Sequence, residues 1–368
     1  MRKTGREVLF MSATKTSRRK GEGDFIRLKN GKIMYVYTEM VGTEAFDDFD
    51  LSQISAIFSS DEGETWGEKR VLFTTDKNDL NSISVSVLRF ANDDIGIFFC
   101  VCFKNEQGDM KGRLVCHRSS DECQTFDKPL IICDKFYEYP ANQRVIKLKN
   151  GRIILPVNRH RNLPEGKTSF GSESRFYFSD DDGKSFYDSG NSYNCEYAHS
   201  GLQETGVIEM ENGKLFAFSR TSCGSQFESF SEDSGSTWTA PRPSSIFFSP
   251  GAPMTITHLK GNKTLAVWNP IPNYPGRKDS EHEWSRRTPM IGLVCDGEGE
   301  NLFNGKNIPM VFEDDDWNSY CYPSIFAGDD YFLIAYYHSN NTKLTLNSLK
   351  MIKVEYKDIF PEEEKKEN

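Results

Sequence analysis

One eight-residue pattern occurs four times in this chain and constrains its fold more than any other feature. The copies at residues 59–66, 119–126, 179–186 and 231–238 read SSDEGETW, SSDECQTF, SDDDGKSF and SEDSGSTW. Their starts are 60, 60 and 52 residues apart, and a regular period of this length is typical of repeat architectures. A degraded fifth copy is indicated at residues 295–299. The chain is therefore predicted to consist of similar, consecutive units.

Each copy has the composition of a turn between two β-strands. Its Asp can accept backbone N–H bonds inside the turn, and its aromatic residue begins the next strand. Three copies have a Gly that can adopt a positive φ, where the second copy has Cys123. A second turn signal, Asn-Gly between apolar segments, recurs at residues 30–31, 150–151 and 212–213. Two hairpin turns per unit imply about four strands, which is the blade of a β-propeller. Six blades of about 61 residues would fill the chain, so the sequence predicts an all-β, six-bladed β-propeller with these turns.

The repeats span the chain and indicate one domain over residues 1–368. We expect residues 1–17 and 358–368 to be flexible ends, since polar termini are often poorly ordered. We also expect the N-terminal and C-terminal strands to close the ring within one blade. Aromatic residues make up 13% of the sequence, which is enough for a sizeable core and excludes a largely disordered chain.

Composition excludes several functional classes. The net charge of −9 disfavours sequence-independent nucleic-acid binding, which depends on Lys and Arg. No apolar run reaches the roughly 18–20 residues of a membrane-spanning helix, and the N-terminal segment does not resemble a secretory signal. The nine cysteines are scattered without Cys-x-x-Cys spacing, as expected for buried thiols in a reducing compartment. We therefore predict a cytoplasmic protein without a metal, a cofactor, or a nucleic-acid or membrane partner; the sequence leaves its oligomeric state open.

The pattern Ser-x-Asp-x-Gly-x-Thr-Trp resembles the Asp box, or bacterial neuraminidase repeat, of the sialidase superfamily, whose members are six-bladed propellers. Residues 201–209 (GLQETGVIE) and 320–325 (YCYPSI) resemble a bacterial subgroup of sialidase-like propellers. The resemblance extends from about residue 18 to residue 337. It implies a retaining glycoside hydrolase with a tyrosine nucleophile, a Glu that activates the tyrosine and an Asp acid/base. It also implies arginines that bind the substrate carboxylate.

The resemblance assigns the catalytic roles to three residues. Glu204 precedes a predicted hairpin and corresponds to the activating Glu. Tyr322 corresponds to the nucleophile, with Tyr320 as the alternative within Tyr-Cys-Tyr. The acid/base Asp is expected in the loop from residue 39 to residue 53, where we favour Asp48 over its acidic neighbours.

Two of the three clamp arginines have counterparts by the same resemblance. Arg220 lies 16 residues after Glu204, and Arg287 precedes the fifth repeat trace, with Arg286 as its rival. The Arg-Ile-Pro motif of the first clamp arginine is absent, because its place falls on Gly21, beside the acidic Glu22. The nearby cations at residues 18, 19 and 20 are candidates to replace it. A sialic acid, another sugar acid and a neutral sugar all remain open as substrates.

Further substrate-binding candidates follow from position. Arg144 and Asn142 open a hairpin at the same relative place as Glu204, where an inner strand begins and faces the central pocket. His160 follows that hairpin, and Trp268 follows a predicted strand; aromatic rings stack on sugar faces.

The sequence favours an exo-α-sialidase-like glycoside hydrolase that releases a terminal sialic acid or related acidic sugar from a small glycan. The alternatives are a glycosidase for a non-sialic sugar, a non-catalytic carbohydrate-binding propeller and a protein-binding scaffold. A few arginines gathered in one pocket can attract an acidic sugar despite the negative net charge of the chain.

Overall fold

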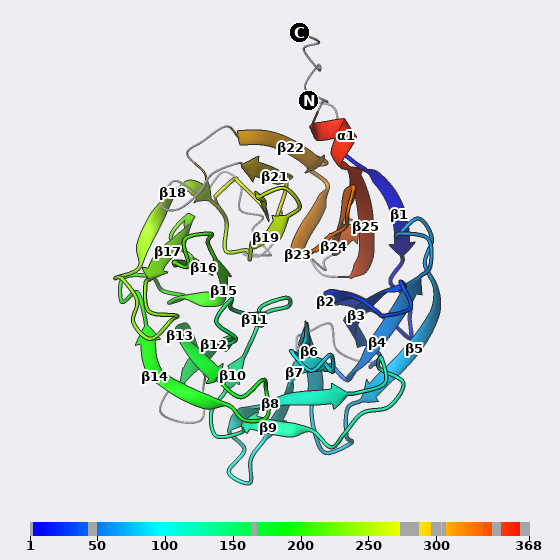
Figure 1. Cartoon of the computed structure of the whole chain (residues 1–368). Coiled ribbons are helices and arrows are strands. Elements are labelled where there is room, and N and C mark those ends of the chain that lie inside the picture. Colours follow the sequence, from blue (N-terminus) through cyan, green and yellow to red (C-terminus); the bar gives the residue numbers. More distant parts are fainter. Residues whose placement is uncertain are drawn as a thin grey trace.

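The computed structural model describes residues 3–42, 50–162, 168–272, 287–295, 303, 307–340 and 347–360. They form six antiparallel sheets arranged in a ring (Figure 1), which confirms the predicted six-bladed β-propeller. Within the sheets the chain runs from an innermost strand outward, and the N-terminal strand is the outermost strand of the last sheet.

The strand bounds define the six blades. Blade 1 contains β2 (Arg19–Arg27), β3 (Ile33–Met40), β4 (Ser52–Ser59) and β5 (Gly67–Thr74). Blade 2 contains β6 (Asn81–Arg89), β7 (Ile95–Lys104), β8 (Met110–Ser119) and β9 (Leu130–Cys133). Blade 3 contains β10 (Glu138–Tyr139), β11 (Ile146–Lys147), β12 (Ile153–Asn162), β13 (Thr168–Ser179) and β14 (Tyr187–Tyr193).

The second half of the ring is built in the same way. Blade 4 contains β15 (Gln203–Glu209), β16 (Leu215–Arg220), β17 (Ser225–Ser231) and β18 (Arg242–Phe248). Blade 5 contains β19 (Thr255–Leu259), β20 (Lys263–Trp268), β21 (Met290–Cys295) and β22 (Asn307–Glu313). Blade 6 contains β23 (Asn318–Ala327), β24 (Tyr331–Asn340), β25 (Ser348–Glu355) and β1 (Arg6–Met11), and α1 (Tyr356–Ile359) follows it.

The ring closes within blade 6, where β1 pairs with β25 in an antiparallel ladder. The expectation of a flexible end over residues 1–17 is therefore wrong for this strand, because its backbone hydrogen bonds are satisfied by β25. At the other end, Ile359 of α1 is buried in the core between blades 5 and 6. Residues 361–368 lie outside the described residues.

The repeated eight-residue turns have the hydrogen bonds that their residue types predict. In the first copy the Asp61 carboxylate accepts bonds from the Thr65 backbone N–H (3.0 Å) and hydroxyl (2.5 Å). Ser59 Oγ accepts the Gly63 N–H at 2.9 Å, and Gly63 has a φ of 80°. The aromatic residue that ends each copy packs into the cluster shared with the preceding blade, as Trp66 does beside blade 6. These turns therefore connect neighbouring blades through their aromatic residues.

Six hydrophobic clusters form the core, one between each pair of adjacent blades. All nine cysteines are free thiols; seven are buried, Cys133 is half-buried and Cys223 is exposed. The Asn-Gly and eight-residue turns lie at one face of the ring. Because strands alternate in direction, the innermost strands begin at the opposite face, where the residues discussed below lie.

Candidate active site

The innermost strands are interrupted by bulges near their starting ends. The ladder register shifts within β2, β6, β15 and β23, and a bulge redirects a side chain. At these bulges, and just before β11, one residue has a positive φ: Glu22, Ser84, Gln143, Glu204 and Tyr322. Five blades thus place a comparable residue toward the propeller axis. Two of the five are Glu204 and Tyr322, the predicted base and nucleophile.

Glu204, Tyr322 and Arg220 form one hydrogen-bonded cluster, although blades 4 and 6 supply them. The Tyr322 hydroxyl donates to Glu204 Oε1 at 2.5 Å, and Arg220 Nη1 donates to the same oxygen at 2.9 Å. Arg220 Nη1 lies 3.4 Å from Tyr322 Oη. Arg220 stands opposite the start of β15 because it pairs with Gln203 in the ladder. The structure therefore brings a phenol into direct contact with a carboxylate that can accept its proton.

Burial controls the electrostatics of this cluster. Burial raises the pKa of Tyr322 well above its usual range, and the Glu204 and Glu22 carboxylates raise it further, while Arg220 and Arg287 oppose them. Burial would lower the pKa of Arg220, but the Glu204 carboxylate raises it above its ordinary value. Tyr322 is therefore a neutral phenol whose proton is already directed at Glu204. Among the described residues, the second carboxylate oxygen, Glu204 Oε2, has no hydrogen-bond partner.

Arg287 also lies beside Tyr322. Its guanidinium carbon is 5.7 Å from the centre of the Tyr322 ring, and Nη2 donates to the Gly251 carbonyl at 3.1 Å. Nη1 is buried and finds no partner within the described part of the chain. Asn269 holds the segment by donating to the Arg287 carbonyl at 2.9 Å. The rival Arg286 lies outside the described residues.

The first clamp arginine has no counterpart at Gly21. A Cβ added to Gly21 would lie 2.5 Å from the Tyr337 ring, so that ring fills the space. Arg19, two residues earlier on the same face of β2, reaches this ring instead: its Nε donates to Tyr337 Oη at 2.9 Å. Arg19 also forms an ion pair with Glu22. Of the three candidate cations, Lys20 turns away and donates to the Ser17 carbonyl at 2.6 Å.

Glu22 belongs to the same group of side chains, although the sequence analysis gave it no role. It is only 5% exposed, and its Oε2 accepts a hydrogen bond from Ser84 Oγ at 2.9 Å. Tyr337 Oη lies 3.4 Å from Oε1, and the Tyr337 ring packs edge-on against Tyr322 at 5.9 Å. A spacing signal was present: Glu22 and Glu204 each precede the Gly of an Asn-Gly turn by nine residues.

Arg144 and Asn142, both predicted to bind substrate, are engaged by backbone carbonyls. Arg144 is 2% exposed, and it donates to the carbonyls of Glu204 (3.1 Å) and Met254 (2.8 Å). Burial lowers the pKa of Arg144 to about 10. Asn142 Nδ2 donates to the carbonyls of Gly23 and Pro323. Both side chains brace the starts of innermost strands in blades 1, 4, 5 and 6, so they act on the site by positioning its bulges.

The remaining substrate-binding candidates divide between the site's edge and the core. His160 Nε2 lies 2.8 Å from Tyr139 Oη, and Tyr139 is near enough to raise the pKa of Arg220. Tyr320 and Trp268 belong to the clusters between blades, and the indole N–H of Trp268 donates to the Phe248 carbonyl. The structure therefore does not bring Tyr320 or Trp268 into the Tyr322 cluster.

The predicted acid/base, Asp48, lies outside the described residues. The described ends of its loop are Gly42 and Asp50, which join the adjacent strands β3 and β4 of blade 1 at the face where the innermost strands begin.

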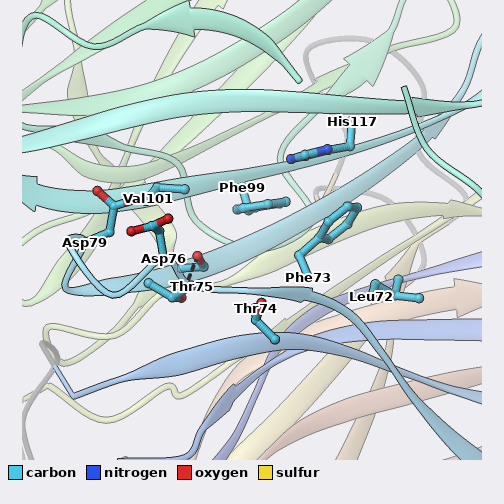
Figure 2. A pocket seen from close by; sticks show the side chains of 10 residues that line it. Leu72, Phe73, Thr74, Thr75, Asp76, Asp79, Phe99, Val101 and His117 are labelled. Atoms are coloured by element: carbon cyan, nitrogen blue, oxygen red, sulfur yellow. Dashed lines mark hydrogen bonds between the residues drawn. The ribbon is translucent and has the colours of Figure 1, made fainter. Parts of the chain in front are cut away.

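A separate pocket of about 370 Å³ lies between blades 1 and 2. Figure 2 shows its aromatic side, formed by Phe73, Phe99 and His117, and its acidic side, formed by Asp76 and Asp79. His117 packs on Phe73 with a ring distance of 4.1 Å, and burial lowers its pKa to about 4. None of the predicted catalytic residues lines this pocket.

Two further observations concern the described residues alone. They contain no group of three or more His, Cys, Asp or Glu side chains placed to hold a metal ion. None of their helices has the length and apolar character needed to cross a bilayer.

Comparison with solved structures places the fold among sialidase-like propellers. A protein of unknown function from Dyadobacter fermentans is 17% identical with a TM-score of 0.72, over 95% of this chain and 99% of that one. The leech intramolecular trans-sialidase is 12% identical with a TM-score of 0.71, over 96% of this chain and 70% of that one. The Ruminococcus gnavus intramolecular trans-sialidase is 13% identical with a TM-score of 0.71, over 96% and 97%.

At these identities the likeness establishes the fold alone. A search of curated proteins gave no significant match. The family model described as the BNR repeat-like domain matches residues 53–334, which is most of the chain and contains all four eight-residue turns. The chain therefore belongs to the BNR repeat-like domain family and has a sialidase-like, six-bladed propeller fold.

Proposed function

We propose that this protein is a retaining, exo-acting glycoside hydrolase of the sialidase type, with Tyr322 as nucleophile and Glu204 as its base. The observation that carries the proposal is the hydrogen bond of 2.5 Å between Tyr322 Oη and Glu204 Oε1, with Arg220 bound to the same oxygen. A nucleophile within hydrogen-bond distance of a base that is itself held by a third group is the arrangement used for covalent catalysis.

In the first step Tyr322 Oη forms a bond to the anomeric carbon, and the bond from that carbon to the leaving oxygen breaks. The phenolic proton passes to Glu204, and the leaving oxygen takes a proton from an acid, a role we assign to Asp48. In the second step water attacks the anomeric carbon and gives its proton to that same residue, now ionised, while the bond from the anomeric carbon to Tyr322 Oη breaks. Glu204 then returns its proton to the released Tyr322 oxygen. Two displacements retain the anomeric configuration.

A neutral nucleophile suits a sugar that carries a carboxylate at the reacting carbon, because an anionic nucleophile would be repelled by it. Arg287 offers the buried Nη1 to such a carboxylate, and Arg220 Nη1 lies 3.4 Å from the Tyr322 hydroxyl. We therefore propose a terminal sialic acid or a related acidic sugar of a small glycan as the substrate class.

The test is release of fluorophore from an aryl α-sialoside, followed by NMR detection of the first-formed anomer. Tyr322→Phe should reduce kcat by at least about 100-fold, because nucleophilic attack is lost. Tyr320→Phe is the matched control: it removes a neighbouring hydroxyl that lies in the core, and should leave turnover near the wild-type value. Equal loss in both variants, or inversion of configuration, would contradict the mechanism. Turnover of another glycoside but not of the sialoside would reject the sugar and retain the reaction.

A further inference from the structure

Three guanidinium groups lie close to Tyr322 or to its neighbour Tyr337, but little of their positive charge is uncompensated. Arg19 is paired with Glu22, and Arg220 is paired with Glu204 at 2.9 Å. The exposed fractions of these side chains are 13% for Arg19, 5% for Glu22, 9% for Arg220 and 5% for Glu204, so all four are largely buried. Opposite charges in such surroundings are weakly screened. Only Arg287 is left without a carboxylate partner among the described residues, and its Nη1 has no hydrogen bond.

Glu22 brings a second negative charge close to Tyr322. Its carboxylate lies beside Tyr337 Oη, and the Tyr337 ring is in edge-on contact with Tyr322. Ser84 Oγ donates to Oε2 at 2.9 Å, and Arg19 binds Oε1. A carboxylate oxygen accepts two hydrogen bonds, so Oε2 keeps capacity for one more donor. The β2 side of the site can therefore accept a further hydrogen bond from a ligand, and its carboxylate repels a ligand anion.

We propose that Glu22 determines substrate specificity. It limits the site to one ligand carboxylate, which binds beside Arg287. Glu22 itself accepts a hydrogen bond from a hydroxyl of the sugar on the β2 side. This inference rests on the proposed function and narrows its substrate class to monocarboxylate sugars with a hydroxyl near the reacting carbon. Removing the charge of Glu22 should then strengthen the binding of a sugar acid, because repulsion is lost and the Arg19 guanidinium is no longer neutralised.

The test uses equilibrium binding, measured by calorimetry, of N-acetylneuraminic acid and its uncharged methyl ester. Glu22→Gln should bind the acid about tenfold more tightly than wild type and should not gain affinity for the ester. Arg19→Met should change the affinity for the acid in the opposite direction, because it leaves Glu22 without its cation. We expect it to weaken binding of the acid by at least about tenfold. Ser84→Ala is the matched control; it removes one hydrogen bond to Glu22 but no charge, and should change acid binding little.

Unchanged or weaker binding of the acid by folded Glu22→Gln overturns the proposal, as does an equal gain for acid and ester. If Glu22→Gln fails to fold, the opposite-sign effect of Arg19→Met decides, and an unchanged affinity in that variant refutes the charge argument. Binding requires no turnover, so failure of the hydrolase proposal is detected separately by the sialoside assay with Tyr322→Phe.

Discussion

The ion pair between Arg220 and Glu204 gives a stability prediction that does not depend on turnover. The side chains are 9% and 5% exposed and their charged atoms are 2.9 Å apart. Arg220→Met leaves the Glu204 carboxylate buried without its cation, and Glu204→Gln leaves the Arg220 guanidinium without its anion. Each single change should cost about 3–5 kcal/mol of unfolding free energy, because an uncompensated buried charge remains.

The double variant carries neither charge, so it escapes this penalty. A buried pair replaced by neutral groups of similar volume is often close to neutral in stability, and the amide that replaces Glu204 can still accept a bond from Tyr322. We expect the double variant to lose about 1–3 kcal/mol, much less than the summed losses of the single variants. Urea unfolding at 25 °C, followed by tryptophan fluorescence, measures all four proteins. Additivity within about 0.5 kcal/mol would refute the reasoning, because independent sites add to this degree.

Two further predictions concern the inner strand β2. Gly21→Ala should destabilise the fold by about 1–3 kcal/mol in thermal unfolding, because its Cβ would lie 2.5 Å from the Tyr337 ring; unchanged stability would show that the ring can move freely. Burial raises the pKa of Asp24 from 3.8 to about 7, so the folded state binds more protons than the unfolded state between these values and loses stability as the pH rises through this window. Relative to Asp24→Asn, the wild type should lose up to about 4 kcal/mol between pH 4 and pH 8 in urea titrations, and a constant difference would contradict this assignment.

The fold was accessible from the sequence because its signals are local and repeated. An Asp that caps its own turn and an Asn-Gly hairpin need only neighbouring residues, as the bonds from Thr65 to Asp61 illustrate. Four copies at near-equal spacing then fix the blade size. The fifth copy falls on residues 295–299, of which only Cys295 is described, at the end of β21.

The site was accessible only in part, because its contacts join distant blades. Glu204 and Tyr322 are 118 residues apart, and only the resemblance suggested pairing them. Position within a hairpin indicated that Arg144 approaches the axis, but not that carbonyls of blades 4 and 5 would occupy its guanidinium. Tyr320 and Tyr322 are two residues apart in the sequence, yet the bulge in β23 places Tyr320 in the core and Tyr322 toward the axis.

The bulges explain why polar residues of one hairpin position become a site. A regular strand alternates its side chains between the two faces of a blade. There the side chains pack against neighbouring blades and do not point toward the propeller axis. A bulge with a positive φ turns one residue out of this alternation; four innermost strands contain such a bulge, and a positive-φ residue precedes β11. Because these five residues occupy comparable positions, the blades need only different residue types there to assemble an acid, a phenol and their partners. Glu22 occupies the same position in blade 1 as Glu204 in blade 4, so the feature that creates the proposed base also places the carboxylate to which we assign specificity.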